Sequence, residues 1–173
     1  MRGIVALLDQ YIEQAYEVNV MNSTINMLKN GLYVPTLKYT YDSMKHELPS
    51  KIKQSHQAAG IFLNAVHVLN PEEKEKLAVM LMEKAAQAEQ VMNELRTRLE
   101  GIIARITEQN GVVPNIVDGV IPMVSANRNI EDDELESLYR DVFQQKEKVE
   151  FAFNIYNNYS AYLGFSRNQS RSM

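Results

Sequence analysis

The stretch that decides the fold runs from residue 71 to residue 110 and reads PEEKEKLAVM LMEKAAQAEQ VMNELRTRLE GIIARITEQN. Apolar side chains recur along it in steps of three and four, the spacing that gathers them on one face of an α-helix. The stripe consists of Ala78, Leu81, Ala85, Ala88, Met92, Leu95, Leu99, Ile102 and Ile106. Because Gly101 is the only Gly or Pro after Pro71 in this stretch, the pattern predicts one helix, about 60 Å long at 1.5 Å per residue.

Local signals mark both ends of this helix. Asn70 is a favoured N-cap, Pro71 suits the first helical position, and Glu73 places a carboxylate in the first turn. Asn110 and Gly111 predict the C-terminal end, because glycine can adopt the left-handed conformation that closes many helices. A helix this long needs partners along its apolar stripe, so the rest of the chain is expected to supply helices that cover it.

The N-terminal part of the chain is predicted to form three helices. The first spans residues 4–30, and Asn22 falls within its stripe, where an Asn either fixes register or faces solvent. The apolar members of this stripe are Ile4, Leu8, Tyr11, Ala15, Val18 and Ile25. Pro35 suits the start of a short helix over 35–47, and Pro49 is predicted to break it. The third helix, over 50–69, is expected to turn inward Ile52, Ala59, Phe62, Leu63, Val66 and Leu69.

The last helix is predicted over residues 130–163. Asn129 is its expected N-cap, an acidic first turn follows, and Gly164 is expected to end it. Its stripe consists of Leu138, Val142, Val149, Ala152, Tyr156, Tyr159 and Leu163. Residues 165–173 are rich in Ser, Arg, Asn and Gln, and we expect them to form a flexible C-terminal tail.

These elements predict an all-α protein, an elongated helical bundle in one domain over residues 1–164. Its main feature is a long antiparallel helical hairpin, about 71–110 and 130–163, packed as in a coiled coil and joined by an apolar hairpin-like loop. The expected seam sets Met92, Leu95, Leu99 and Ile102 against Val142, Val149 and Ala152. Because the helix over 71–110 is longer than its expected neighbours, part of its stripe is predicted to pair with a second copy, giving a homo-oligomer.

The connector over residues 111–128 is unusually apolar. Pro114 and Pro122 exclude a helix there, and Asp118-Gly119 favours a tight β-hairpin turn. An isolated apolar hairpin needs cover, so the segment either plugs the bundle or docks on a partner. The candidate partner-binding residues at this tip are Val113, Ile116, Val117, Val120, Ile121 and Met123.

A second candidate surface is an aromatic cluster near the C-terminus. Phe and Tyr alternate there with Asn and Ser, and hardly any charge follows Glu150. Tyrosine suits an interface because its ring is apolar while its hydroxyl can face water, but the same pattern suits the wet edge of an intramolecular core. The candidate partner-binding residues in this cluster are Tyr156, Tyr159, Tyr162 and Phe165.

Composition excludes several classes of site. The chain has 173 residues, no Cys, 18 Lys and Arg, and 22 Asp and Glu, which leaves a formal net charge of -4. Disulfides, thiolate catalysis and cysteine-ligated metals are excluded, and an acidic balance disfavours nucleic acid as a partner. His56 and His67 lie about 16 Å apart on one helical line, too far to share an ion, and neither they nor His46 belong to a Glu-x-x-His motif. We therefore expect no metal site and no cofactor.

Three carboxylates stand at steps of four on the first helix. Asp9, Glu13 and Glu17 would repel one another along one face, so they are expected to pair with lysines from neighbouring helices. The candidate lysines are Lys38, Lys45, Lys51 and Lys53.

No motif for catalysis is present, neither a phosphate-binding loop nor a Gly-x-Ser-x-Gly nucleophile. The chain is therefore expected to be a non-catalytic interaction or assembly protein, an adaptor or regulator that binds a protein partner. The alternatives are a membrane-active protein that uses the 112–124 tip, which is not favoured, and a helical-bundle ligand binder or enzyme. Since no targeting or membrane-spanning segment is evident, a cytoplasmic location is expected.

Overall fold

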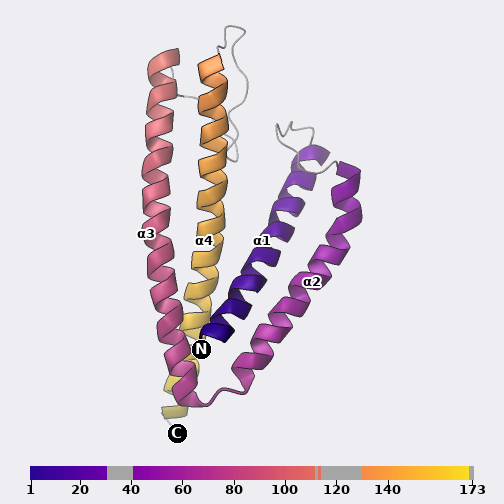
Figure 1. Cartoon of the computed structure of the whole chain (residues 1–173), viewed down its shortest axis with the longest axis vertical. Coiled ribbons are helices and arrows are strands. Elements are labelled where there is room, and N and C mark those ends of the chain that lie inside the picture. Colours follow the sequence, from indigo (N-terminus) through magenta and orange to yellow (C-terminus); the bar gives the residue numbers. More distant parts are fainter. Residues whose placement is uncertain (31–40, 112, 114–129, 172–173) are drawn as a thin grey trace. The chain divides into compact units, whose positions relative to one another are not determined.

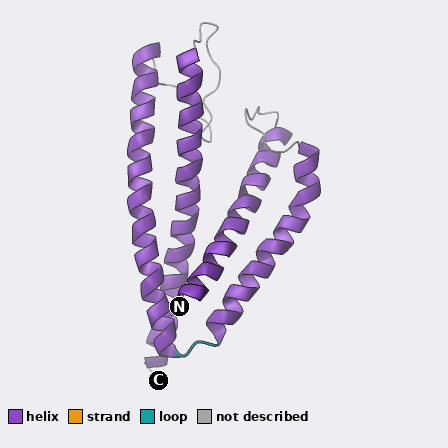
Figure 2. Cartoon of the chain, viewed as in Figure 1, coloured by secondary structure: helices purple, strands orange, loops and turns teal. Residues whose placement is uncertain are grey.

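The structure is a computed structural model that describes residues 1–30, 41–111, 113 and 130–171, with the side chains of 41, 130–133 and 165–171 left aside. Within these residues the chain forms four α-helices and no strand (Figures 1 and 2). They are α1 (Arg2–Lys29), α2 (Tyr41–His67), α3 (Pro71–Asn110) and α4 (Ile130–Arg171). The all-α helical fold predicted from the sequence is confirmed.

The chain divides into two compact units. Unit 1 consists of residues 1–84 and 154–173, and unit 2 consists of residues 85–153. Unit 1 thus holds α1, α2, the start of α3 and the end of α4, whereas unit 2 holds the remaining parts of α3 and α4.

In unit 1 the helices α1 and α2 pack against each other. Met21 and Ile25 of α1 form a buried cluster with Met44 of α2, and Leu28 and Leu48 pack against it. The residues of unit 1 that are almost completely buried are Leu8, Phe62, Leu77, Leu81 and Leu163. All four helices therefore contribute to the core of this unit.

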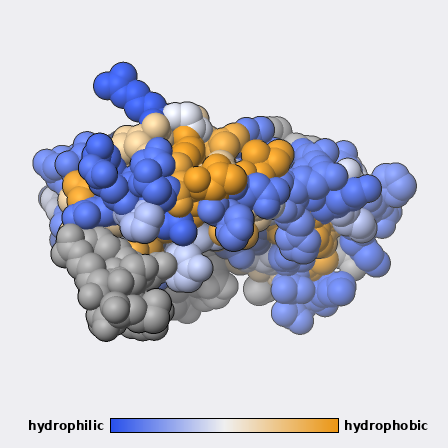
Figure 3. All heavy atoms as spheres, turned by 90° about the horizontal axis from the view of Figure 1, so that it is seen from below, coloured by the Kyte–Doolittle hydropathy of each residue, from blue (hydrophilic) through white to orange (hydrophobic). Residues whose placement is uncertain are grey.

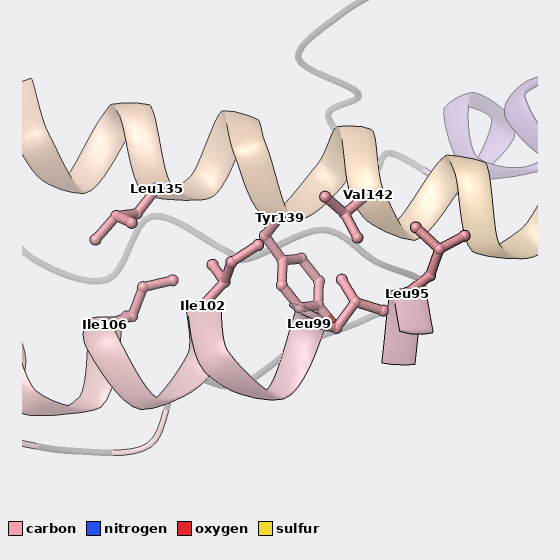
Figure 4. Packing of buried hydrophobic residues seen from close by; sticks show 7 residues of the cluster. All are labelled: Leu95, Leu99, Ile102, Ile106, Leu135, Tyr139 and Val142. Atoms are coloured by element: carbon pink, nitrogen blue, oxygen red, sulfur yellow. The ribbon is translucent and has the colours of Figure 1, made fainter. Parts of the chain in front are cut away.

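Unit 2 is an antiparallel pair of helices with one apolar seam (Figure 4). Figure 4 places Ile106 beside Leu135 at one end and Leu95 near Val142 at the other, so α3 and α4 run in opposite directions here. The full seam consists of Leu95, Leu99, Ile102, Ile106, Leu135, Tyr139 and Val142. The stripe predicted on α3 is buried along its length apart from Ala88, which is half-buried.

Both ends of α3 lie where local signals predict them. The side chain of Asn70 accepts a hydrogen bond from the backbone N–H of Glu73 at 2.8 Å, and the carboxylate of Glu73 accepts one from the backbone N–H of Asn70 at 3.1 Å. This reciprocal capping box satisfies two donors that a helix start would leave unpaired. At the other end Gly111 has φ +74°, the left-handed conformation expected of a closing glycine.

Two predicted helix breaks are wrong. Pro49 lies inside α2, so the helix predicted over 50–69 begins at least as early as Tyr41. A proline in a helix interior costs about 3 kcal/mol, but Met44 and Leu48 on its N-terminal side are held by packing against α1, which offsets this cost. The start predicted at Pro35 lies outside the described residues.

Gly164 likewise lies inside a helix, because α4 continues to Arg171. A glycine costs a helix only about 1 kcal/mol relative to alanine, and the preceding Leu163 is almost completely buried in unit 1. The helical assignment through Arg171 contradicts the helix end predicted at Gly164, whereas the division into a 1–164 domain and a flexible tail stays a prediction.

Leu63 and Leu138, which were predicted to face inward, are exposed, and so is Asn22, for which the sequence left a seam position and a solvent-facing position open. Asn22 faces solvent while its neighbour Met21 is buried against α2, so Asn22 is not a register-fixing seam residue within this chain. Leu63 is 45% exposed and Leu138 is 40% exposed. In each case a residue next to it in sequence is buried instead: Met21, Phe62 and Tyr139. Neighbouring residues on a helix point about 100° apart, so one of them can be buried while the other is exposed.

Candidate functional site

Two of the three carboxylates of α1, Asp9 and Glu17, form ion pairs with lysines of other helices, but only one of these lysines was predicted. Lys51 donates to Glu17 at 3.3 Å, which confirms one predicted partner. Asp9 instead binds Lys84 of α3 at 3.2 Å. Sequence reasoning missed this pair because the two residues stand 75 positions apart and neither carries a local signal of the other.

Tyr156 of α4 joins this pair within unit 1. Its hydroxyl donates a hydrogen bond to the second carboxylate oxygen of Asp9, and the ammonium of Lys84 lies 5.4 Å from the centre of its ring. Burial raises the pKa of the Tyr156 phenol, and the hydrogen bond to Asp9 and the negative charges of Asp9 and Glu13 raise this pKa further. The phenol therefore stays protonated and donates a hydrogen bond to Asp9, rather than serving as a base.

Most of the described aromatic cluster points into unit 1. Tyr156 is buried, and the ring of Tyr159 packs edge-on against Phe62 of α2 with ring centres 5.1 Å apart. Burial also raises the pKa of the Tyr159 phenol. These contacts agree with the alternative of an intramolecular core edge. Tyr162 differs, because it is 63% exposed.

The remaining candidate residues from the sequence do not converge on a described site. Val113 is exposed directly after α3. Phe165 lies in α4, but its side chain is outside the described residues. The other tip candidates, Ile116, Val117, Val120, Ile121 and Met123, are also outside the described residues, as is the predicted β-hairpin.

The part of the chain that the structure describes contains neither a cluster of metal ligands nor a membrane-spanning helix. Nowhere among them do three His, Asp or Glu side chains gather in a way that could hold a metal ion. None of the helices within the described ranges is long and apolar enough to cross a bilayer. All three histidines are exposed, and all three lie on α2.

A groove of about 170 Å³ lies between α1 and α2. Its polar lining is formed by four glutamines, Gln10, Gln14, Gln54 and Gln57, and its apolar lining includes Leu7 and Ile61. The side-chain oxygen of Gln14 is buried there, yet no described residue donates a hydrogen bond to it. The groove thus combines uncharged hydrogen-bonding groups with apolar contact area, a combination that suits a polypeptide better than an ion.

The exposed face of α2 continues from this groove. Three large apolar side chains are exposed at the end of the helix and just beyond it: Ile61 (56%), Leu63 (45%) and Val68 (79%). No Asp or Glu occurs from Leu48 to Pro71, so this face carries amides, apolar groups and cationic or histidine side chains. We call it the α2 face and define it by the exposed residues Lys53, His56, Gln57, Ile61, Leu63, His67 and Val68.

Both units expose large apolar side chains. Beyond the α2 face, those of unit 1 are Val20, Val79, Met82 and Tyr162, and those of the described part of unit 2 are Val91, Val113 and Leu138. Seen from the end where α2 passes into α3, the surface shows apolar side chains gathered among hydrophilic ones (Figure 3). Sequence reasoning missed the α2 face because Leu63 was predicted to face inward and Ile61 was not assigned to either side of the helix.

Comparison of the chain with models of protein families, with curated protein sequences and with solved structures found no match.

Proposed function

We propose that this chain is a non-catalytic interaction protein, an adaptor or regulator of the cytoplasm, and that it binds a protein partner through the α2 face and the adjoining groove. The observation that carries the proposal is the exposure of Ile61, Leu63 and Val68 beside a groove whose buried Gln14 oxygen accepts no hydrogen bond from the described residues. Large exposed apolar side chains close to hydrogen-bonding groups are typical of a protein-binding surface.

An exposed apolar surface gains free energy when a partner covers it. Covering the exposed parts of Ile61, Leu63 and Val68 contributes roughly 25 cal/mol for each Å² of apolar area. This gain arises only on binding, so it favours a docking role for this face.

The strongest described cluster of titratable groups supports folding better than catalysis. Lys84 is paired with Asp9, and the hydroxyl of Tyr156 donates a hydrogen bond to the same carboxylate. A general base needs a pKa near the working pH, whereas the pKa of Tyr156 is raised away from it. We therefore assign this cluster to holding α1, α3 and α4 together within unit 1.

Capture from cells of the source organism tests the proposal. The native chain is compared with Ile61→Ser/Gln57→Ala, which changes exposed groups of the α2 face, and with Leu138→Ser as a control of similar exposure in unit 2. We expect one partner that the native chain and the control retain and the α2 variant loses, with all three melting cooperatively at similar temperatures. Equal capture by the α2 variant would contradict the proposed function.

The sequence also predicts a homo-oligomer, so the α2 face could be covered by a second copy of the chain instead of another protein. Sedimentation of the purified native chain and of the α2 variant distinguishes a partner protein from a second copy. A dimer that the α2 variant abolishes would show that a second copy occupies the face.

A further inference from the structure

An asparagine that directly precedes a glycine can lose ammonia without an enzyme. The backbone nitrogen of the glycine attacks the side-chain carbonyl carbon of the asparagine, and the proton of that nitrogen leaves with the ammonia. Water then opens the resulting cyclic imide to aspartate or isoaspartate. Glycine favours this reaction because it has no side chain to hinder the attack. The chain contains two such pairs, Asn30-Gly31 and Asn110-Gly111, and the structure describes both residues of the second pair.

The Asn110-Gly111 pair is open to water. Asn110 is exposed at the last position of α3, and Gly111 is exposed directly after it. Apart from its chain neighbours, no described residue has an atom within 4 Å of the point where a Cβ of Gly111 would stand. The imide ring and the water that opens it therefore have room at this position.

The last turn of α3 opposes the reaction. The backbone N–H of Gly111 donates a hydrogen bond to the backbone oxygen of Thr107 at 2.7 Å, so the attacking nitrogen is already engaged. Ring closure also requires a backbone rotation at Asn110 that takes this residue out of the helical conformation. The imide therefore forms only after this turn has unwound.

Packing in unit 2 sets how readily the turn unwinds. Ile106 is buried just before it, and Figure 4 shows Ile106 beside Leu135 of α4. None of residues 107–111 is buried, so this packing ends at Ile106. A helix end with few buried contacts opens at a low free energy, and this opening would expose the Gly111 nitrogen.

We propose that Asn110 is a site of spontaneous deamidation and that unwinding of the last turn of α3 sets its rate. The reaction consumes only water, so it is independent of the proposed function. Aspartate or isoaspartate at position 110 adds a negative charge to the C-terminal end of the helix dipole, and no basic residue in the last turn of α3 offsets it. Isoaspartate also lengthens the backbone by one carbon and so disrupts the cap formed by Gly111. Deamidation is therefore expected to shorten α3.

Peptide mass spectrometry of the purified native chain tests the proposal. The chain is incubated folded in buffer, and unfolded in guanidinium chloride at the same pH and temperature. The folded chain is expected to form aspartate and isoaspartate at position 110 about tenfold more slowly than the unfolded chain. Protection of the Gly111 amide against hydrogen exchange should give the same factor, because both reactions require the same opening.

Two variants test whether packing of α3 controls the rate. Ile106→Ala removes the buried contact before the last turn, so its rate at Asn110 should rise toward that of the unfolded chain. Val91→Ala is the matched control because it shortens a side chain of the same helix that is 41% exposed, and its rate should equal that of the native chain. Circular dichroism establishes that both variants are folded under the conditions of the assay.

Three results would overturn the inference. The first is an equal rate in the folded and the unfolded native chain, and the second is no product at position 110 of the folded chain after the unfolded chain has reacted completely. The third is a folded Ile106→Ala variant that reacts at the native rate. The first two comparisons use only the native chain, so they decide the question even where Ile106→Ala does not fold.

Discussion

A polar contact in unit 1 joins three helices: it consists of Asp9 of α1, Lys84 of α3 and Tyr156 of α4. The carboxylate of Asp9 accepts hydrogen bonds from both partners, one through each oxygen. A hydrogen bond to a charged group contributes about 1.5–3 kcal/mol, and the buried phenol donates such a bond to Asp9. Nearby, the hydroxyl of Ser160 donates to the backbone oxygen of Ala78 at 2.9 Å and ties α4 to α3 a second time.

Replacement of Tyr156 by Phe should therefore lower the free energy of unfolding by about 1–3 kcal/mol at neutral pH. The loss should shrink in alkali. Because folding raises the pKa of Tyr156, the unfolded chain loses this proton first, near pH 10, so the contribution is complete below that value and falls as pH rises toward the folded pKa.

Urea unfolding of the native chain, Tyr156→Phe and Tyr162→Phe between about pH 8 and pH 11 checks this prediction. Tyr162 is the control because it is exposed, and its variant should match the native chain. A difference between the native chain and Tyr156→Phe that grows in alkali would contradict the assigned hydrogen bond.

At the scale of the helix, α2 shows how packing overrides a local signal. Pro49 cannot donate to the preceding turn, yet α2 continues through it. Replacement of Pro49 by Ala should raise the free energy of unfolding by about 1–3 kcal/mol, because the variant restores a helical hydrogen bond and removes the clash of the ring with the preceding turn.

The control for Pro49 is Ser50→Ala, an exposed change one residue further along α2 that should alter stability by no more than about 0.5 kcal/mol. Thermal unfolding followed by circular dichroism compares the two. A less stable Pro49→Ala would mean that α2 requires a break at this position.

The seam of unit 2 gives a second test at this scale. Leu99 is buried between α3 and α4, whereas Leu138 is 40% exposed although it stands beside the seam in sequence. Leu99→Ala should cost about 2–5 kcal/mol and Leu138→Ala less than about 0.5 kcal/mol. Equal costs measured in urea would show that the seam follows the stripe read from the sequence, with Leu138 inside it.

The sequence predicts the features that are determined within one helix better than those that depend on packing between helices. The bounds and core face of α3 follow from its own residues, since Asn70, Gly111 and an unbroken stripe act locally. The continuity of α2 through Pro49 does not, because it depends on packing against α1. The exposure of Leu63 cannot be predicted locally either. The apolar stripe shows that the helix has a buried side, but it does not show how much of that side the neighbouring helix covers.

For the molecule as a whole, the two units differ in how their cores are built. Residues from all four helices meet in unit 1, where Leu8, Phe62, Leu77 and Leu81 have no exposed area. The seam of unit 2 comes from two helices, and most of its buried residues keep a few per cent of their surface exposed. A helix that is covered by fewer neighbouring helices requires less free energy to unfold locally.

Hydrogen exchange should therefore separate the two units. Backbone amides of residues 77–81 should exchange at least about tenfold more slowly than those of residues 95–106, although both segments lie in α3. Exchange followed by mass spectrometry of peptides measures this ratio. Uniform protection along α3 would contradict the difference between the two cores.

The central claim is that the α2 face is where this protein meets its partner. Photo-crosslinking tests it most directly, with a photoreactive amino acid placed at Gln57 on this face or, as the control, at the exposed Ala104 of unit 2, in cells of the source organism. We predict a crosslinked product from position 57 that is absent from position 104. A product from position 104 alone, or from neither position, would contradict the claim.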